Sequence, residues 1–172
     1  MGKITFIFGG ARSGKSSFSV KIAKARRVAF IATCEPRDCE MKKRITSHQN
    51  SRPSFWKTFE EPLNVAALIR KISGEYDLIL IDCITLLLCN LLLKRFSEEK
   101  IEKEILGIIS ALKKGKVDSV LISNEVGMGI VPRNKLSREF RDIQGRANQI
   151  IAKESSKVYF MLAGIPLRIK GG

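Results

Sequence analysis

An octapeptide near the start of the chain constrains the fold and the function more than any other feature. It fits the spacing G-x-x-x-x-G-K-[ST] and reads Gly9-Gly10-Ala11-Arg12-Ser13-Gly14-Lys15-Ser16. An apolar run, Ile4–Phe8, precedes it and an amphipathic stretch, Phe18–Ala25, follows it. Glycines in such a loop let successive backbone N–H groups turn toward phosphate oxygens, and the following helix N-terminus adds positive potential. The alternative is an ordinary glycine turn, but the flanking strand and helix patterns favour a nucleotide phosphate-binding loop.

Two side chains of this loop have expected roles. Lys15 would neutralise the β- and γ-phosphates of a nucleotide, and the Ser16 hydroxyl would ligate Mg²⁺. Chemistry of this kind needs an acid at the end of a neighbouring strand, and Asp82 follows four apolar residues. Asp82 could instead cap a helix beginning near Ile84. We favour the metal-linked role and name Ser16 and Asp82 as the candidate metal residues.

Apolar periodicity predicts an α/β fold. The predicted strands, continuously apolar and therefore expected to be fully buried, are Ile4–Phe8, Val28–Ala32, Leu78–Asp82, Val120–Asn124 and Val158–Leu162. Helical patterns lie between them, including one capped by Ser97 and another spanning Leu136 to Ile150. This alternation predicts a mostly parallel sheet with helices on both faces. After the turn signal Gly164-Ile165-Pro166, we expect Leu167–Lys170 to form an antiparallel edge strand.

Length and composition limit the remaining choices. At 172 residues the chain is expected to form one domain, residues 1–172. The stretch Leu78–Leu93 is too short for a membrane span of about 20 apolar residues, so we expect none. No signal peptide is expected, and the four cysteines form no CxxC pair. A cytoplasmic protein with reduced thiols and no zinc site is therefore predicted.

The formal net charge of +14 has two interpretations. It could attract polyanions, including nucleic acid, or it could reflect a solvated lysine-rich surface. Basic residues are scattered along the chain without an arginine-rich tail or interleaved aromatics. We favour the second interpretation and expect no nucleic-acid partner.

His48 is the only histidine of the chain. A helix beginning near Asp38 would place it at the end of an apolar stripe, where histidines usually serve packing or carry a C-terminal charge. The alternative is a neutral imidazole beside phosphate, flanked by Arg44 and Arg52, that attacks phosphorus and carries a nucleotidyl group. From composition alone the structural role is favoured.

Six segments in a fixed order carry a resemblance to a known family. They are the octapeptide Gly9–Ser16; Ile31-Ala32-Thr33; Arg44…His48…Arg52-Pro53…Trp56; Asp82-Cys83-Ile84-Thr85; Asn124-Glu125-Val126-Gly127-Met128-Gly129-Ile130-Val131-Pro132; and Phe140-Arg141-Asp142-Ile143-Gln144-Gly145-Arg146-Ala147-Asn148-Gln149. With them the chain resembles the bifunctional adenosylcobinamide kinase / adenosylcobinamide-phosphate guanylyltransferase family of cobalamin biosynthesis. The segment from Asn124 to Pro132 is highly specific, and the resemblance spans almost the whole chain.

The resemblance implies a RecA-like P-loop NTPase fold, a homotrimer and two reactions. ATP or GTP would phosphorylate adenosylcobinamide, and GMP would then pass from GTP to that phosphate through a GMP-histidine intermediate, giving adenosylcobinamide-GDP and pyrophosphate. The matching histidine is His48, which the resemblance favours as the nucleophile. The implied nucleotide-binding residues are Gly9, Gly10, Ala11, Arg12, Ser13, Gly14, Lys15, Ser16, Ala32, Thr33, Cys34, Gln49, Asn50, Ser51, Arg52, Glu60 and Asp82.

Some alternatives stay open. Glu125 could position the corrinoid side chain or a metal-bound water, or cap the next element, and Arg141 and Arg146 could meet phosphate or another subunit. Rival functions are a P-loop kinase of another small molecule, an ATPase stimulated by nucleic acid and a nucleotide-binding module without turnover. The first would form no covalent nucleotidyl adduct, and the second would lose binding steeply with salt. The nucleotide-binding module without turnover is disfavoured by the presence of four potential catalytic residues, Lys15, Ser16, Asp82 and His48.

Overall fold

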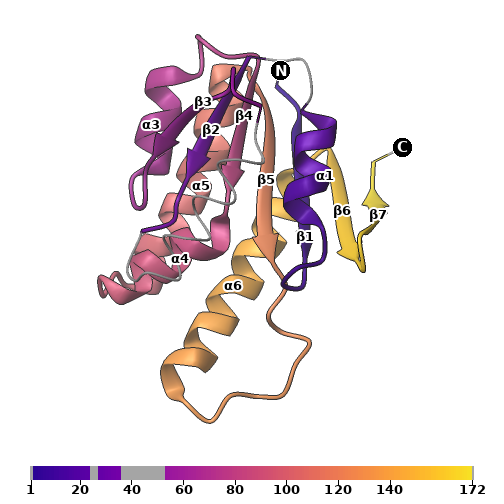
Figure 1. The fold of residues 1–172 in the computed structure, drawn as a ribbon. Helices are drawn as coiled ribbons and strands as arrows, with labels where there is room; N and C mark the ends of the chain where they lie inside the picture. The colour runs from indigo at the N-terminus through magenta and orange to yellow at the C-terminus, as the bar shows by residue number, and fades with distance from the viewer. Residues whose placement is uncertain (1, 24–26, 36–52, 172) are drawn as a thin grey trace.

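The computed structural model describes residues 2–23, 27–35 and 53–171. Their strands form one seven-stranded sheet in the order β3-β2-β4-β5-β1-β6-β7 (Figure 1). The strands are β1 (Ile4–Gly9), β2 (Val28–Ala32), β3 (Lys57–Glu60), β4 (Leu78–Asp82), β5 (Asp118–Asn124), β6 (Lys157–Leu162) and β7 (Ile165–Lys170). The helices are α1 (Lys15–Ile22), α3 (Val65–Ile72), α4 (Ile84–Leu93), α5 (Glu98–Gly115) and α6 (Lys135–Glu154).

The pairing of the strands confirms a mostly parallel sheet with an antiparallel edge. Strands β1 to β6 pair with one another in parallel, whereas β6 and β7 pair antiparallel. Parallel strands require crossover connections, and the described helices lie in those that follow β1, β3, β4 and β5. As a result, the carboxyl ends of β1, β2, β3, β4 and β5 meet at one edge of the sheet.

Helices cover both faces of the sheet. Alternate residues of a strand point to opposite faces, so Phe6 joins one core cluster and Ile7 the other. The first cluster packs against α3, α4, α5 and α6, and the second against α1 and Trp56. Figure 1 shows α1 in front of the sheet and the long α6 behind it. Both faces of the central strands are thereby buried, as their continuous apolar runs predict.

Two features of the sheet differ from the sequence-based expectation. The strand β3 was not predicted, because its residues are mixed polar and aromatic and it lies half-exposed at the edge beside β2. Strand β6 was expected to be fully buried, but only Val158 and Met161 of its residues are buried. Its single outer neighbour is the exposed strand β7, so helices do not enclose it as they enclose β4 and β5.

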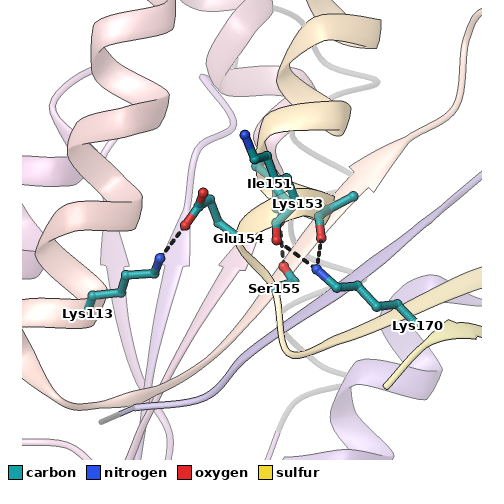
Figure 2. Close-up of polar contacts among 7 residues, drawn as sticks. Lys113, Ile151, Lys153, Glu154, Ser155 and Lys170 are labelled. Carbon is teal, nitrogen blue, oxygen red and sulfur yellow. Dashed lines mark hydrogen bonds and ion pairs between the residues drawn. The ribbon is translucent and has the colours of Figure 1, made fainter. Parts of the chain in front are cut away.

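The C-terminal strand is tied to the end of α6. The Lys170 ammonium donates hydrogen bonds to the carbonyl oxygens of Ala152, at 2.9 Å, and Lys153, at 2.7 Å (Figure 2). The last carbonyls of a helix lack partners within the helix and carry partial negative charge, which a cation stabilises. On the other side of this helix end, Glu154 forms an ion pair with Lys113 of α5. These contacts hold the β6–β7 hairpin in register with the core.

Among the residues that the structure describes, no helix combines the length and the apolar character needed to cross a membrane.

Candidate functional site

The predicted phosphate-binding loop lies between β1 and α1, as its flanking patterns indicate. Gly14 precedes the helix with φ of 92°, a left-handed conformation that a residue with a Cβ rarely adopts. The Lys15 side chain is folded into the loop. Its Nζ donates to Gly9 O at 3.0 Å, to Gly10 O at 2.5 Å and to Ser13 Oγ at 3.4 Å. The ammonium group therefore lies within the ring of loop atoms that would surround a phosphate.

Lys15 is 8% exposed, which has an electrostatic consequence. Burial lowers its pKa from the ordinary value of 10.5, because desolvation penalises the charged form. The neighbouring Cys83 and Asp82 oppose this shift and raise the pKa. A buried ammonium that needs a counter-charge is well suited to binding the anionic phosphates of a nucleotide.

Asp82 and Ser16 meet at the carboxyl edge of the sheet. The Ser16 Oγ of α1 donates to Asp82 Oδ2 at the end of β4 at 3.2 Å, although β5 lies between β4 and β1, the strand that precedes the loop. The helix after Asp82 begins at Ile84 with Cys83 as its N-cap, and no side chain provides a capping hydrogen bond there. The N-cap position that the sequence left open for Asp82 is therefore occupied by Cys83.

Thr33 forms hydrogen bonds to the backbone that follows the same strand end. Its side chain is fully buried, its hydroxyl donates to Cys83 O at 2.7 Å, and the Cys83 N–H donates to the same hydroxyl at 2.9 Å. The Asn90 amide of α4 donates to Thr33 O at 2.8 Å. Thr33 was predicted to bind nucleotide. Here its hydroxyl holds the backbone that immediately follows Asp82.

Most of the remaining described candidates also lie at this edge. In the sheet register Ala32 lies opposite Glu60 on β3 and opposite Asp82 on β4. Glu60 is exposed, and Cys34 is half-buried just beyond β2. The parallel strands thus bring together residues that are far apart in sequence. His48, Gln49, Asn50, Ser51 and Arg52 lie outside the described residues, so their predicted roles remain predictions.

The turn between β6 and β7 supports the phosphate-binding loop, a contact that the sequence analysis missed. Gly164 N donates to Ser13 O at 3.1 Å, and a Cβ added to Gly14 would lie 3.1 Å from the Cα of Gly164. Both residues at this contact are glycines, so the two backbones approach closely. The signal available in the sequence was the turn glycine itself, but nothing local indicated what it would touch.

A second feature that the sequence analysis missed is a buried polar network between α6 and the end of β5. Gln144 and Asn148 occupy the buried face of α6 beside Ile143, Ala147 and Ile151. In the sequence, this network could have been found from a pair of amides at helical spacing on an otherwise apolar helix face. Both are bonded to Ser123, the penultimate residue of β5.

The residues at this edge suit a hard divalent cation. The Ser16 hydroxyl and the Asp82 carboxylate are oxygen donors that already converge within 3.2 Å beside the phosphate-binding loop. Magnesium takes oxygen ligands and commonly binds through one or two protein groups together with substrate phosphates. In the described residues no group of three or more His, Cys, Asp or Glu side chains could hold a metal ion by itself. The arrangement thus fits a cation that arrives with a nucleotide.

Comparison with known proteins identifies the family. The sequence pattern of the family described as cobinamide kinase / cobinamide phosphate guanyltransferase matches residues 5–169. The chain belongs to this family. The resemblance carried by the six sequence segments is confirmed.

Individual members of the cobinamide kinase family support the assignment over nearly the full length. The chain is 40% identical over 167 residues to the bifunctional adenosylcobalamin biosynthesis protein CobP of Pseudomonas aeruginosa, covering 96% of each chain. It is 40% identical over 177 residues to the protein CobU of Salmonella typhimurium, and 37% identical to that of Escherichia coli, covering 95% of this chain and 98% of each relative.

A solved structure agrees with the predicted fold. The KaiC-like protein of Pyrococcus horikoshii OT3 matches 92% of this chain and 70% of its own, with a TM-score of 0.54 and 17% identity. At that identity the likeness concerns the fold alone. It confirms the RecA-like arrangement, in which one strand, here β5, separates the strand of the phosphate loop from the strand of the acid.

Proposed function

We propose that this chain catalyses both reactions named in the description of its family, using the one nucleotide site. It phosphorylates adenosylcobinamide with ATP or GTP and then transfers GMP from GTP to the product. The proposal is supported above all by the convergence of Lys15, Ser16 and Asp82 at the carboxyl edge of the sheet. It includes a homotrimer, which the family resemblance implies, and a cytoplasmic location, which the sequence predicts.

In the kinase step a hydroxyl oxygen of adenosylcobinamide attacks the γ-phosphorus of the nucleotide. The bond from that phosphorus to the β,γ-bridging oxygen breaks, the hydroxyl proton passes to solvent, and a nucleoside diphosphate leaves. Lys15 and the loop amides hold the phosphate charge in place, so that the two reactants meet in line. Ser16 and Asp82 would hold Mg²⁺, which supplies charge neutralisation on the phosphates when bound.

In the transferase step a nitrogen of His48 attacks the α-phosphorus of GTP, and the bond to pyrophosphate breaks. A phosphate oxygen of adenosylcobinamide phosphate then attacks the same phosphorus, which releases the histidine and forms the diphosphate of adenosylcobinamide-GDP. A free imidazole has a pKa of about 6.5, so it is mostly neutral and nucleophilic at pH 7 to 8.

Labelling tests this assignment. The protein is incubated with Mg²⁺ and GTP labelled at the α-phosphate, and we expect an acid-labile, base-stable protein label that adenosylcobinamide phosphate discharges. H48A is expected to take up no label while retaining kinase turnover, and a circular dichroism spectrum confirms that it is folded. A label on folded H48A would exclude His48 as the nucleophile. Phosphorylation of another small molecule without any label would instead favour a simple P-loop kinase.

A further inference from the structure

Hydrogen bonds to three elements hold the backbone of Asn124 and Glu125 at the carboxyl end of β5. Asn124 N donates to Thr85 Oγ1 of α4 at 2.7 Å. Asn124 O accepts from Asn148 Nδ2 of α6 at 3.1 Å. Glu125 N donates to Gly9 O at 3.0 Å, at the start of the phosphate-binding loop. The backbone at this point therefore links α4, the loop that carries Lys15 and the helix α6.

The Asn148 amide has only one orientation that satisfies its neighbours. Its Oδ1 accepts from Ser123 Oγ at 2.7 Å and from Gln144 Nε2 at 3.0 Å. Gln144 Nε2 also donates to Ser123 Oγ at 2.8 Å. With two donors directed at Oδ1, the Nδ2 group must point toward the Asn124 carbonyl. Ser123 and Gln144 thus orient Asn148 without touching Asn124 O themselves.

This network is poorly explained as a source of stability. Ser123 and Gln144 are fully buried and Asn148 is 7% exposed, so each amide is desolvated. Within the described part of the chain Gln144 Oε1 has no hydrogen-bond partner. A buried unsatisfied acceptor costs about 1 to 3 kcal/mol, and apolar side chains of similar shape would avoid that cost. What the polar set provides instead is a unique position for the β5 terminus.

From these contacts we infer that Asn148 is a positioning residue for catalysis. Through its hydrogen bond to the Asn124 carbonyl it fixes the backbone between Asp82 and the phosphate-binding loop, and Gln144 and Ser123 fix Asn148. The role so inferred is exerted through the backbone, since the Asn148 side chain is buried. The kinetic part of this inference depends on the proposed kinase activity, whereas its structural part concerns the 124–125 peptide alone.

Two substitutions separate positioning from stability. N148A removes the donor to Asn124 O at every pH. N148D keeps an acceptor for Ser123 and Gln144, but its carboxylate faces a carbonyl oxygen until it is protonated, after which it can donate. Burial raises the pKa of a carboxyl group, so this recovery should occur above pH 4. S123A disturbs the same network without removing the bond to Asn124, and Q149A changes an exposed amide beside Asn148.

For the kinase reaction we expect N148A and N148D to lower kcat at pH 8 by at least about tenfold, with KM for ATP changed less than about threefold. The loss in N148D should shrink as the pH falls, relative to the wild type, while that in N148A stays constant. Q149A should stay within about threefold of the wild type, and S123A should lose less than N148A because Gln144 still donates to Asn148 Oδ1. A kcat loss in S123A equal to that in N148A, or no pH recovery in a folded N148D, would overturn the inference.

Amide hydrogen exchange tests the same inference without any substrate. In N148A the amides of Asn124 and Glu125 should exchange about tenfold faster than in the wild type, while that of Ile79 in β4 stays protected. Q149A should leave all three unchanged. Unaltered exchange at residues 124 and 125 would refute the positioning role. If the wild type turns over no cobinamide while N148A still exchanges faster at residues 124 and 125, only the proposed function would be refuted.

Discussion

Ser16 and Asp82 lie in hydrogen-bond contact, with Oγ 3.2 Å from Oδ2, although 66 positions separate them in the chain. The first lies in the first turn of α1, after the phosphate-binding loop, and the second ends β4. Their contact spans the width of β5, which lies between β1 and β4. The contact can therefore form only when β1, β5 and β4 are paired in this order.

This contact predicts that Asp82 governs the response to Mg²⁺. D82N keeps an oxygen that can accept from Ser16 but removes the negative charge, so the Mg²⁺ concentration for half-maximal kinase velocity should rise about 10- to 100-fold. The control is D77N, because Asp77 lies just before the opposite end of β4 and pairs with Arg27. D77N should stay within about threefold of the wild type. If D82N and the wild type need the same Mg²⁺ concentration for half-maximal velocity, Asp82 does not take part in binding the metal.

Lys15 should contribute to activity at the expense of stability. K15M removes a desolvated ammonium, while Gly9 O still accepts from Glu125 N and Gly10 O from Ser13 N. We expect K15M to lose at least about a hundredfold in kcat/KM for both reactions. Its unfolding temperature without nucleotide should equal or exceed that of the wild type, as measured by thermal denaturation. A large fall in that temperature would show that Lys15 is needed for folding.

The pH dependence of this stability difference follows from the lowered pKa of Lys15. Because the folded pKa lies below the ordinary 10.5, the folded state binds fewer protons than the unfolded state between the two values. Stability rises with pH wherever the unfolded state binds more protons. The wild type should therefore gain stability relative to K15M as the pH rises through the folded pKa of Lys15 toward 10.5. If the difference in the free energy of unfolding between the wild type and K15M is constant over this pH range, the burial of the charged group is contradicted.

The turn between β6 and β7 offers a substitution expected to stabilise the protein. Ala163 and Gly164 both have positive φ, 49° and 85°, as a two-residue type I′ hairpin turn requires. Asparagine tolerates this conformation better than alanine does. A163N should therefore raise the free energy of unfolding by roughly 0.5 to 1 kcal/mol, as measured by urea denaturation. Destabilisation by A163N would mean that Asn cannot be accommodated where the turn meets the phosphate-binding loop.

Cys83 should be chemically inert in the folded protein. Burial raises its pKa to about 12, with the charge of Asp82 adding to the shift. The thiolate is the reactive form, so an alkylating reagent at pH 8 should modify the half-buried Cys34 and Cys89 first. Mass spectrometry of tryptic peptides measures the order, and urea should expose Cys83. Labelling of Cys83 as fast as Cys89 in the native protein would contradict its burial.

The sequence by itself determined the local elements and the phosphate-binding loop. β2 and β4 have the predicted bounds, and α5 starts directly after Ser97, because continuous apolar runs and helix-end residues act over a few positions. The family resemblance likewise came from short segments. The loop motif and the apolar run before Asp82 supplied the candidate residues Gly9 to Ser16 and Asp82 before any contact was known.

Only the tertiary structure decided how these parts meet. No local pattern shows that β5 separates β1 from β4, that Gly164 contacts Ser13, or that Asn148 bonds to Asn124. Strand order and such contacts depend on how the helices pack on both faces of the sheet, which is a property of the whole chain. For the same reason the bond between Thr33 and Cys83 could not be found from the sequence, and the predicted nucleotide contact of Thr33 stays a prediction. Motifs are encoded locally, whereas the hydrogen bonds between them exist only once the sheet has formed.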